Sequence, residues 1–365
     1  MPSARINSVN EQTACLAMMA EVVNSGQFAG GDAIIRLEKL LEEYYQATSC
    51  IATSSGADAL KIALAAIGVG AGDEIIIPHN AFAATENAIF SIGAKPVYAN
   101  IDESFNINPT EIARLATDKT KAVLAVCLYG SIRNMQQISR EAECHELRVI
   151  IDAAQCFGIP EILRFSDAVA LSFNPVKNIG GFGKSGALLT YSTEIAKRAR
   201  QFSHHGIVEG EIHVKAHGRG FNSRMDNIQA SAILAKFGFF EVNALKRAFL
   251  AYRYINQLTL LERKGRIILP IERLGNTWHL FPIRVNEAKR DELIRYAKIM
   301  NVEFDIHCTP PGHGDAHDYT PLHRDKISFP MSSFIYFSVL HIPLHNHMSL
   351  EEQDTVIKVI YDFFK

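Results

Sequence analysis

The first half of the chain alternates short apolar runs with amphipathic stretches, and this alternation limits the possible folds more than any other feature. Residues 49–53, 74–77, 95–100, 122–128 and 148–152 are predicted strands, because they are short, apolar and bounded by turn residues. Helical spacing between them predicts helices at 84–92, 110–116 and 135–145. Strands that alternate with helices in this way predict a parallel sheet with helices on both faces. Ligands of such sheets bind beyond the carboxyl ends of the strands.

The pattern changes after about residue 240. A long helix is expected at 239–261, followed by strands at 266–269 and 277–285, a helix at 288–299 and a final helix at 349–364. We therefore predict a large α/β domain over residues 1–240 and a smaller C-terminal α/β domain over 241–365.

Charge and composition exclude several classes of protein. The 365 residues carry 37 Lys and Arg against 39 Asp and Glu, a net charge of −2, which argues against a protein that coats nucleic acid. The longest stretch without charged residues, 327–350, contains two prolines and several serines, so we interpret it as core strand and turn and not as a membrane span. Six cysteines without a CxxC pair, and no secretory start, predict a cytoplasmic protein with reduced thiols.

The segment 149–190 carries the chemistry. One predicted strand ends in Asp152, and the strand at 168–173 leads into a glycine-rich loop that contains Lys177. Lysine forms Schiff bases with carbonyl compounds. A pyridoxal phosphate site needs such a lysine, an anion against the ring nitrogen, and a helix N-terminus for the phosphate. Residues 54–58, a glycine flanked by small polar residues before a helix, supply the third part.

Each part also has an ordinary structural interpretation. A lysine in a loop is usually solvated, an aspartate after a strand commonly forms a turn, and Ser-Ser-Gly before a helix is commonly only an N-cap. The order of phosphate loop, acid and lysine within one α/β domain favours the cofactor site. A metal centre is not expected, because the C-terminal histidines match no standard zinc spacing and lack a cysteine pair. These histidines are His313, His317, His323, His341, His345 and His347.

Ordered motifs over nearly the whole chain resemble the DegT/DnrJ/EryC1/StrS sugar aminotransferases, which have the type I fold of pyridoxal phosphate enzymes. That fold pairs a large domain, with a mainly parallel sheet between helices, and a smaller C-terminal α/β domain. The matching segments are 25–31, 37–38, 55–60, 78–85, 128–130, 152–155, 172–178, 205–206, 220–226, 278–280, His307 and 342–343.

The resemblance implies a role for each matching residue. Lys177 would hold the cofactor covalently and move the proton, Asp152 would pair with the ring nitrogen, and Gln155 would hydrogen-bond the phenolic oxygen. Phe82 would stack on the ring, although a core aromatic is its ordinary alternative. Phosphate contacts would come from Gly56, Ala57 and Ser172, and from Asn222 of the partner subunit. Substrate contacts would come from Arg224, for which a structural ion pair is the alternative, and from His307 and His313.

The resemblance also implies the reaction. Glutamate would donate an amino group to pyridoxal phosphate, and the cofactor would pass it to a keto group of a nucleotide-activated sugar in a ping-pong cycle within a homodimer. The stretch between Gln155 and Ser172 is several residues shorter than is usual in the family, where it forms a hairpin near the substrate entrance. An aminotransferase for another keto-polyol, a sugar acid or a sugar phosphate is therefore the first alternative. The second is a cofactor-binding regulator without turnover.

Overall fold

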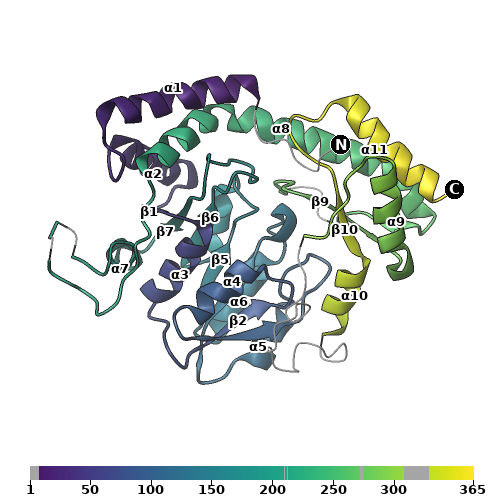
Figure 1. The fold of residues 1–365 in the computed structure, drawn as a ribbon. Helices are drawn as coiled ribbons and strands as arrows, with labels where there is room; N and C mark the ends of the chain where they lie inside the picture. Colours follow the sequence, from purple (N-terminus) through teal and green to yellow (C-terminus); the bar gives the residue numbers. More distant parts are fainter. Residues whose placement is uncertain (1–7, 209, 212, 272–274, 308–328) are drawn as a thin grey trace.

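The computed structural model describes residues 8–208, 210–211, 213–271, 275–307 and 329–365. Its centre is a seven-stranded sheet with helices on both faces (Figure 1). The strand order is β1-β7-β6-β5-β4-β2-β3, and only β7 runs antiparallel to its two neighbours. The predicted mainly parallel sheet is confirmed. The strands are β1 (Ser49–Thr53), β2 (Glu74–Pro78), β3 (Lys95–Ala99), β4 (Thr120–Val126), β5 (Arg148–Asp152), β6 (Ala168–Ser172) and β7 (Gly186–Thr190).

The central strands are apolar on both sides because a hydrophobic core lies on each face of the sheet. One core contains side chains from α2 (Asp32–Tyr45), α5 (Thr110–Leu115), α6 (Met135–Cys144) and the first part of α8 (Asn227–Arg263). The other contains side chains from α3 (Gly56–Ala66), α4 (Ala83–Phe90) and α7 (Thr193–Ser203). The carboxyl ends of the parallel strands therefore stay open for a site.

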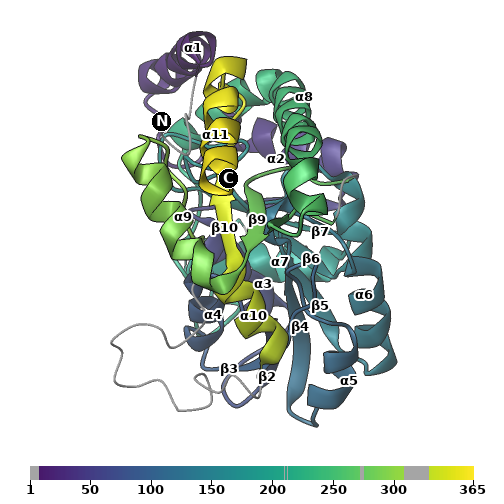
Figure 2. The same cartoon turned by 90° about the vertical axis from the view of Figure 1, so that its right-hand side faces the viewer.

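A second unit is built on the far half of α8. Its three-stranded antiparallel sheet has the order β10-β9-β8, and its hydrophobic core draws only on residues from Leu250 onward. In Figure 2, α11 and α9 cover this sheet, and α10 leads toward the large sheet. The elements are β8 (Ile267–Ile268), β9 (Phe281–Val285), α9 (Glu287–Ile299), α10 (Pro330–Ser338), β10 (Val339–Ile342) and α11 (Leu350–Phe363).

The N-terminal helix α1 (Val9–Ser25) packs along α8 (Figure 1). Ser8 caps it through a reciprocal capping box with Glu11, so its first turn is held in place. The buried Glu11 then lies against α8, where Asn243 donates to its Oε1 at 2.8 Å. The start of α1 thereby reaches the interior of the molecule.

The structure corrects two details of the prediction. The long helix begins at Asn227 and not at 239, because Ala230 and Ile233 continue its apolar face against the large sheet. The proposed domain boundary at 240 thus falls inside a continuous helix. Residues 330–338 form a helix that starts at Pro330, where the analysis expected strand and turn. Among the described helices, none combines the length and the apolarity that crossing a bilayer requires.

Candidate active site

Asp152 is the last residue of β5, and its carboxylate lies buried at the carboxyl edge of the sheet with 7% of the residue exposed. Thr85 donates its hydroxyl to Oδ2 at 2.8 Å, and the N–H of Ala154 donates to Oδ1 at 3.0 Å. Burial raises the pKa of Asp152, and these two hydrogen bonds and the charge of Lys177 counteract the rise only in part. The carboxylate is therefore placed where a cationic ligand atom would stabilise it.

Lys177 lies in the tight loop that follows β6. Its N–H donates to the carbonyl of Asn174 at 2.9 Å, and the chain folds back closely enough that a Cβ on Gly180 would lie 2.5 Å from the carbonyl oxygen of Pro175. Asn178 ties the loop to the C-terminal unit: its Nδ2 donates to the carbonyl of Thr277 at 3.2 Å, and its Oδ1 lies 3.0 Å from Nδ1 of His279. The lysine is thus presented by a loop that both units hold.

Gln155 and His307 meet beside this lysine. The N–H of Tyr129 donates to Oε1 of Gln155 at 2.6 Å, and Nε2 of Gln155 contacts Nε2 of His307. The pKa of His307 falls to about 3, because burial, then the positive charge of Lys177, then His341 oppose its protonation. The imidazole is neutral at physiological pH and can donate or accept a hydrogen bond.

Phe82 borders the same place from the start of α4. Its ring is 53% exposed and stacks on His307, with ring centroids 6.1 Å apart and an interplanar angle of 16°. The alternative of a core aromatic is therefore wrong. The exposed face leaves Phe82 open to a ligand ring.

The helix α3 begins beside the end of β6. Ser55 caps the helix by accepting the N–H of Asp58 at 3.0 Å, so the N-cap interpretation holds for this serine. The N–H groups of the first turn have no acceptor within the helix, which leaves those of Gly56 and Ala57 for an anion. A Cβ on Gly56 would lie 2.8 Å from Cβ of Ser172, so only glycine lets the helix start approach the strand this closely.

These residues fit pyridoxal phosphate. The buried carboxylate of Asp152 suits a protonated ring nitrogen, the amide of Gln155 suits the phenolic oxygen, and the start of α3 with Ser172 suits the phosphate. The charge of Lys177 acts on Asp152 and also on His279 and His307, so its amine lies between the sheet edge and the C-terminal unit.

Two predicted residues lie elsewhere. Asn222 and Arg224 are exposed on the segment between α7 and α8 and do not line the cavity beside Lys177. No carboxylate of the described chain forms an ion pair with Arg224, so the structural ion pair is not seen. Backbone bridges fix this segment, pairing His204 with Asn222 and Thr53 with Arg224. His313 lies outside the described residues, as do His317 and His323.

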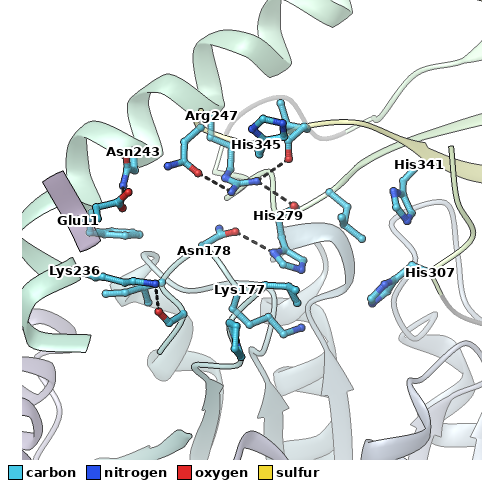
Figure 3. Close-up of a pocket in the computed structure, with 18 of the residues that line it drawn as sticks. Glu11, Lys177, Asn178, Lys236, Asn243, Arg247, His279, His307, His341 and His345 are labelled. Carbon is cyan, nitrogen blue, oxygen red and sulfur yellow. Dashed lines mark hydrogen bonds between the residues drawn. The ribbon is translucent and has the colours of Figure 1, made fainter. Parts of the chain in front are cut away.

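A cavity of about 200 Å³ opens on the other side of the Lys177 loop. Figure 3 shows α8 above it and the loop below, with His307 and His341 at one end and Glu11 and Lys236 at the other. The residues that α1 and α8 contribute to this cavity could not be predicted from the sequence, because they belong to no motif and Glu11 is distant in sequence from the others. They are Glu11, Lys236, Asn243 and Arg247. Within the described part of the chain, no three His, Cys, Asp or Glu side chains are grouped to hold a metal ion.

Comparison with known proteins places the chain among aminotransferases. The profile of the DegT/DnrJ/EryC1/StrS aminotransferase family matches residues 10–361. The 3-oxo-glucose-6-phosphate:glutamate aminotransferase of Bacillus subtilis (strain 168) is 39% identical, over 100% of this chain and 83% of that protein. The pleiotropic regulatory protein of Geobacillus stearothermophilus is 32% identical, over 96% of this chain and 94% of that protein.

Solved structures agree with this placement. The crystal structure of NtdA from Bacillus subtilis with bound cofactor PMP matches with a TM-score of 0.93 and 38% identity, over 99% of this chain and 84% of that chain. The structure of DesV from S. venezuelae in complex with a ketimine intermediate matches with a TM-score of 0.87 and 28% identity, over 96% of this chain and 94% of that chain.

Proposed function

The chain belongs to the DegT/DnrJ/EryC1/StrS aminotransferase family, and we propose that it transfers the amino group of glutamate to the keto group of a phosphorylated sugar in a ping-pong cycle. It is a pyridoxal phosphate-dependent aminotransferase of the sugar-transaminase type. The observation that carries the proposal is the placement of Lys177 between the buried carboxylate of Asp152 and a polar cavity. A lysine in this position can serve the cofactor on one side and a substrate on the other.

Each site residue has a separate role in the proposed reaction. Pyridoxal phosphate, when bound, supplies the electron sink for the substrate carbon. The carboxylate of Asp152, once paired with the ring nitrogen at the sheet edge, would hold that nitrogen protonated. The amine of Lys177 would move a proton between the reacting carbon of the substrate and the carbon of the cofactor to which the amino group is attached. The neutral imidazole of His307 would orient Gln155 through their contact.

A hexose phosphate is our first candidate for the acceptor. It is supported by the 39% identity, over this whole chain, to the Bacillus subtilis enzyme whose name specifies 3-oxo-glucose-6-phosphate and glutamate. The shortened stretch between Gln155 and Ser172 supports it as well, because the described chain holds the short helix η2 (Pro160–Phe165) there and no hairpin.

A nucleotide-activated sugar is the second candidate. The UDP-2-acetamido-2-deoxy-3-oxo-D-glucuronate aminotransferase of Pseudomonas aeruginosa is 30% identical over 91% of this chain and 91% of that protein, and its name specifies such a substrate.

We further propose that the enzyme is a homodimer with composite sites. The segment between α7 and α8 extends away from the body of the molecule (Figure 1). The exposed Asn222 and Arg224 lie at its base, where backbone bridges pair them with His204 and Thr53. A partner subunit could receive these side chains at its own phosphate loop. Sedimentation of the active enzyme tests this proposal, and an active monomer at assay concentration would contradict it.

Mixing the purified, cofactor-loaded protein with glutamate tests the reaction. The absorption band of the lysine-bound cofactor should give way to the band of the pyridoxamine form, with stoichiometric release of 2-oxoglutarate. The pyridoxamine form should then react with a 3-keto-hexose 6-phosphate and return to the first spectrum. A return only with a nucleotide-linked keto-sugar would favour the second acceptor.

A regulator without turnover is the remaining alternative. It is favoured by the name of the Geobacillus stearothermophilus relative, a pleiotropic regulatory protein. It is opposed by the presence of both Lys177 and Asp152, whose charges interact. An unchanged spectrum in the presence of glutamate, with the cofactor bound, would support the regulator and overturn the proposed reaction.

A further inference from the structure

The cavity beside the Lys177 loop contains a buried cation without an acidic partner. Arg247 comes from α8, lines the cavity, and is 8% exposed. Its Nη1 donates to the carbonyls of Trp278, His279 and Leu344 at 3.1–3.2 Å, and its Nη2 donates to Oδ1 of Asn346 at 3.2 Å. Within the described chain, no carboxylate forms an ion pair with this guanidinium.

Burial of an uncompensated charge is costly, and proteins normally pair such a charge. The pKa of Arg247 falls to about 10 through burial, so the side chain still carries its proton at physiological pH. Backbone carbonyl and side-chain amide oxygens accept hydrogen bonds from Nη1 and Nη2 of the guanidinium, and no described residue accepts one from Nε. An oxyanion in the cavity would complete both the hydrogen bonding and the charge balance.

The other charges of the cavity leave room for an anion. Lys236 adds a second cationic group, and the carboxylates are Glu11 and Asp305. The amine of Lys177 is not counted, because it would be bound to the cofactor in the loaded enzyme. Glu11 is already engaged, because Nε2 of His347 lies 3.1 Å from its Oε2 and Asn243 donates to its Oε1. Asp305 lies at the exposed rim. Arg247 therefore faces the loop that carries Lys177 (Figure 3), and no described carboxylate pairs with it there.

A second buried group points to a ligand in the same place. His341 lies on β10 with 5% of the residue exposed, lines the cavity, and has no hydrogen-bond partner for Nδ1 within the described structure. Its ring meets that of His307 edge to face, with centroids 6.3 Å apart. This buried ring nitrogen in the cavity lining offers a polar partner to a ligand that occupies the cavity.

We propose that Arg247 binds the anionic group of the substrates in this cavity, a phosphate or carboxylate oxyanion held while the reacting carbon faces Lys177. The proposal rests on the proposed function, because both substrates of a ping-pong enzyme must use the same space. One anion site can then serve the carboxylate of the amino donor and the phosphate of the sugar in turn.

Two unreactive probes measure the site in the pyridoxal-loaded enzyme by calorimetry. Glucose 6-phosphate represents the sugar phosphate, with glucose as its neutral counterpart. Glutarate represents the amino donor, with glutaramide as its counterpart. We expect at least one anionic probe to bind about 10-fold or more tightly than its counterpart, since charge-assisted contacts to a buried guanidinium are strong. Equal binding of both pairs, or no binding, would overturn the proposal.

The substitution Asn346→Asp places a carboxylate on the guanidinium that Asn346 now contacts. This internal partner should compete with the ligand, so we expect the affinity for the anionic probe to fall about 10-fold or more without loss of thermal stability. Asn346→Ser removes the amide without adding charge and should change the affinity less than about threefold. Arg247→Lys, which keeps the charge but loses the fork, should also weaken binding.

A matched control comes from the same helix. Arg253→Lys alters an arginine that contacts Gln353 and Asp354 away from the cavity, and it should leave probe binding unchanged. A loss confined to glucose 6-phosphate assigns the site to the sugar, and a loss confined to glutarate assigns it to the amino donor. If Asn346→Asp keeps full affinity for the probes while the enzyme still transaminates, the anion site is refuted and the proposed function stands.

Discussion

Replacing Asp152 separates a catalytic carboxylate from a residue that only shapes a turn. In Asp152→Asn the new side chain would keep an oxygen for the N–H of Ala154 and an amide that the Thr85 hydroxyl can contact, so little hydrogen bonding is lost. The substitution also removes a charge whose ionisation burial opposes, as the raised pKa of Asp152 indicates. In the cofactor-free protein we therefore expect Asp152→Asn to be at least as stable as the wild type.

Asp152→Ala differs because it leaves two buried donors, the hydroxyl of Thr85 and the N–H of Ala154, without an acceptor. Each such donor costs about 1–3 kcal/mol, so the free energy of unfolding should fall by roughly 2–6 kcal/mol. Chemical denaturation of the cofactor-free proteins measures both changes. The free energy of unfolding should thus be at least that of the wild type in Asp152→Asn and below it in Asp152→Ala.

The rate of the glutamate half-reaction completes the test. Loss of the charge against the ring nitrogen should slow this half-reaction about 100-fold in Asp152→Asn, which corresponds to about 2.7 kcal/mol of activation free energy. Single-turnover absorbance, normalised to bound cofactor, gives the rate. A rate within threefold of wild type, together with stability lowered by about 1 kcal/mol, would show that Asp152 only shapes the turn after β5.

Three further predictions test other parts of the site. Lys177→Ala should bind the cofactor without a covalent link and lose transamination by several orders of magnitude; a borohydride-fixed cofactor on another lysine would contradict the assignment. Gly56→Ala should lower stability by about 1–3 kcal/mol and weaken cofactor binding, because its Cβ would meet Ser172 at 2.8 Å. The matched substitution Gly238→Ala, in an open helical position of α8, should raise stability by about 0.5–1 kcal/mol. Between about pH 6.5 and pH 3, the unfolded chain binds a proton at His307 that the folded chain does not, so the free energy of unfolding falls as the pH is lowered. His307→Gln should reduce this pH dependence by up to about 1.4 kcal/mol per pH unit in denaturation of the cofactor-free protein. An unchanged pH dependence would contradict the low pKa of His307.

The sequence predicts the large sheet well because its strands are buried on both faces. Such strands appear as continuous apolar runs, and β1 and β5 have the predicted limits. The antiparallel β7 was missed because its five residues follow directly on the glycine-rich loop and give no turn signal of their own. The pairing of Asp152 with Thr85 was missed as well, since it joins residues 67 positions apart. Local patterns specify elements, and they do not specify which distant side chains meet.

The charges of the side chains that line the cavity could not be predicted from local sequence patterns either. The number of histidines in the C-terminal third does not show their charge, because burial determines what those rings can do. The pKa values of His279, His307 and His341 all fall, first through burial and then, for His279 and His307, through the charge of Lys177. These imidazoles are therefore neutral hydrogen-bonding groups at physiological pH. The positive charge of the cavity wall comes from Arg247 and from Lys236, which lies earlier on α8, a helix without any catalytic motif. Under the proposed anion site, the helix that joins the two units would attract the substrate anion, and the motif residues at the sheet edge would serve the cofactor.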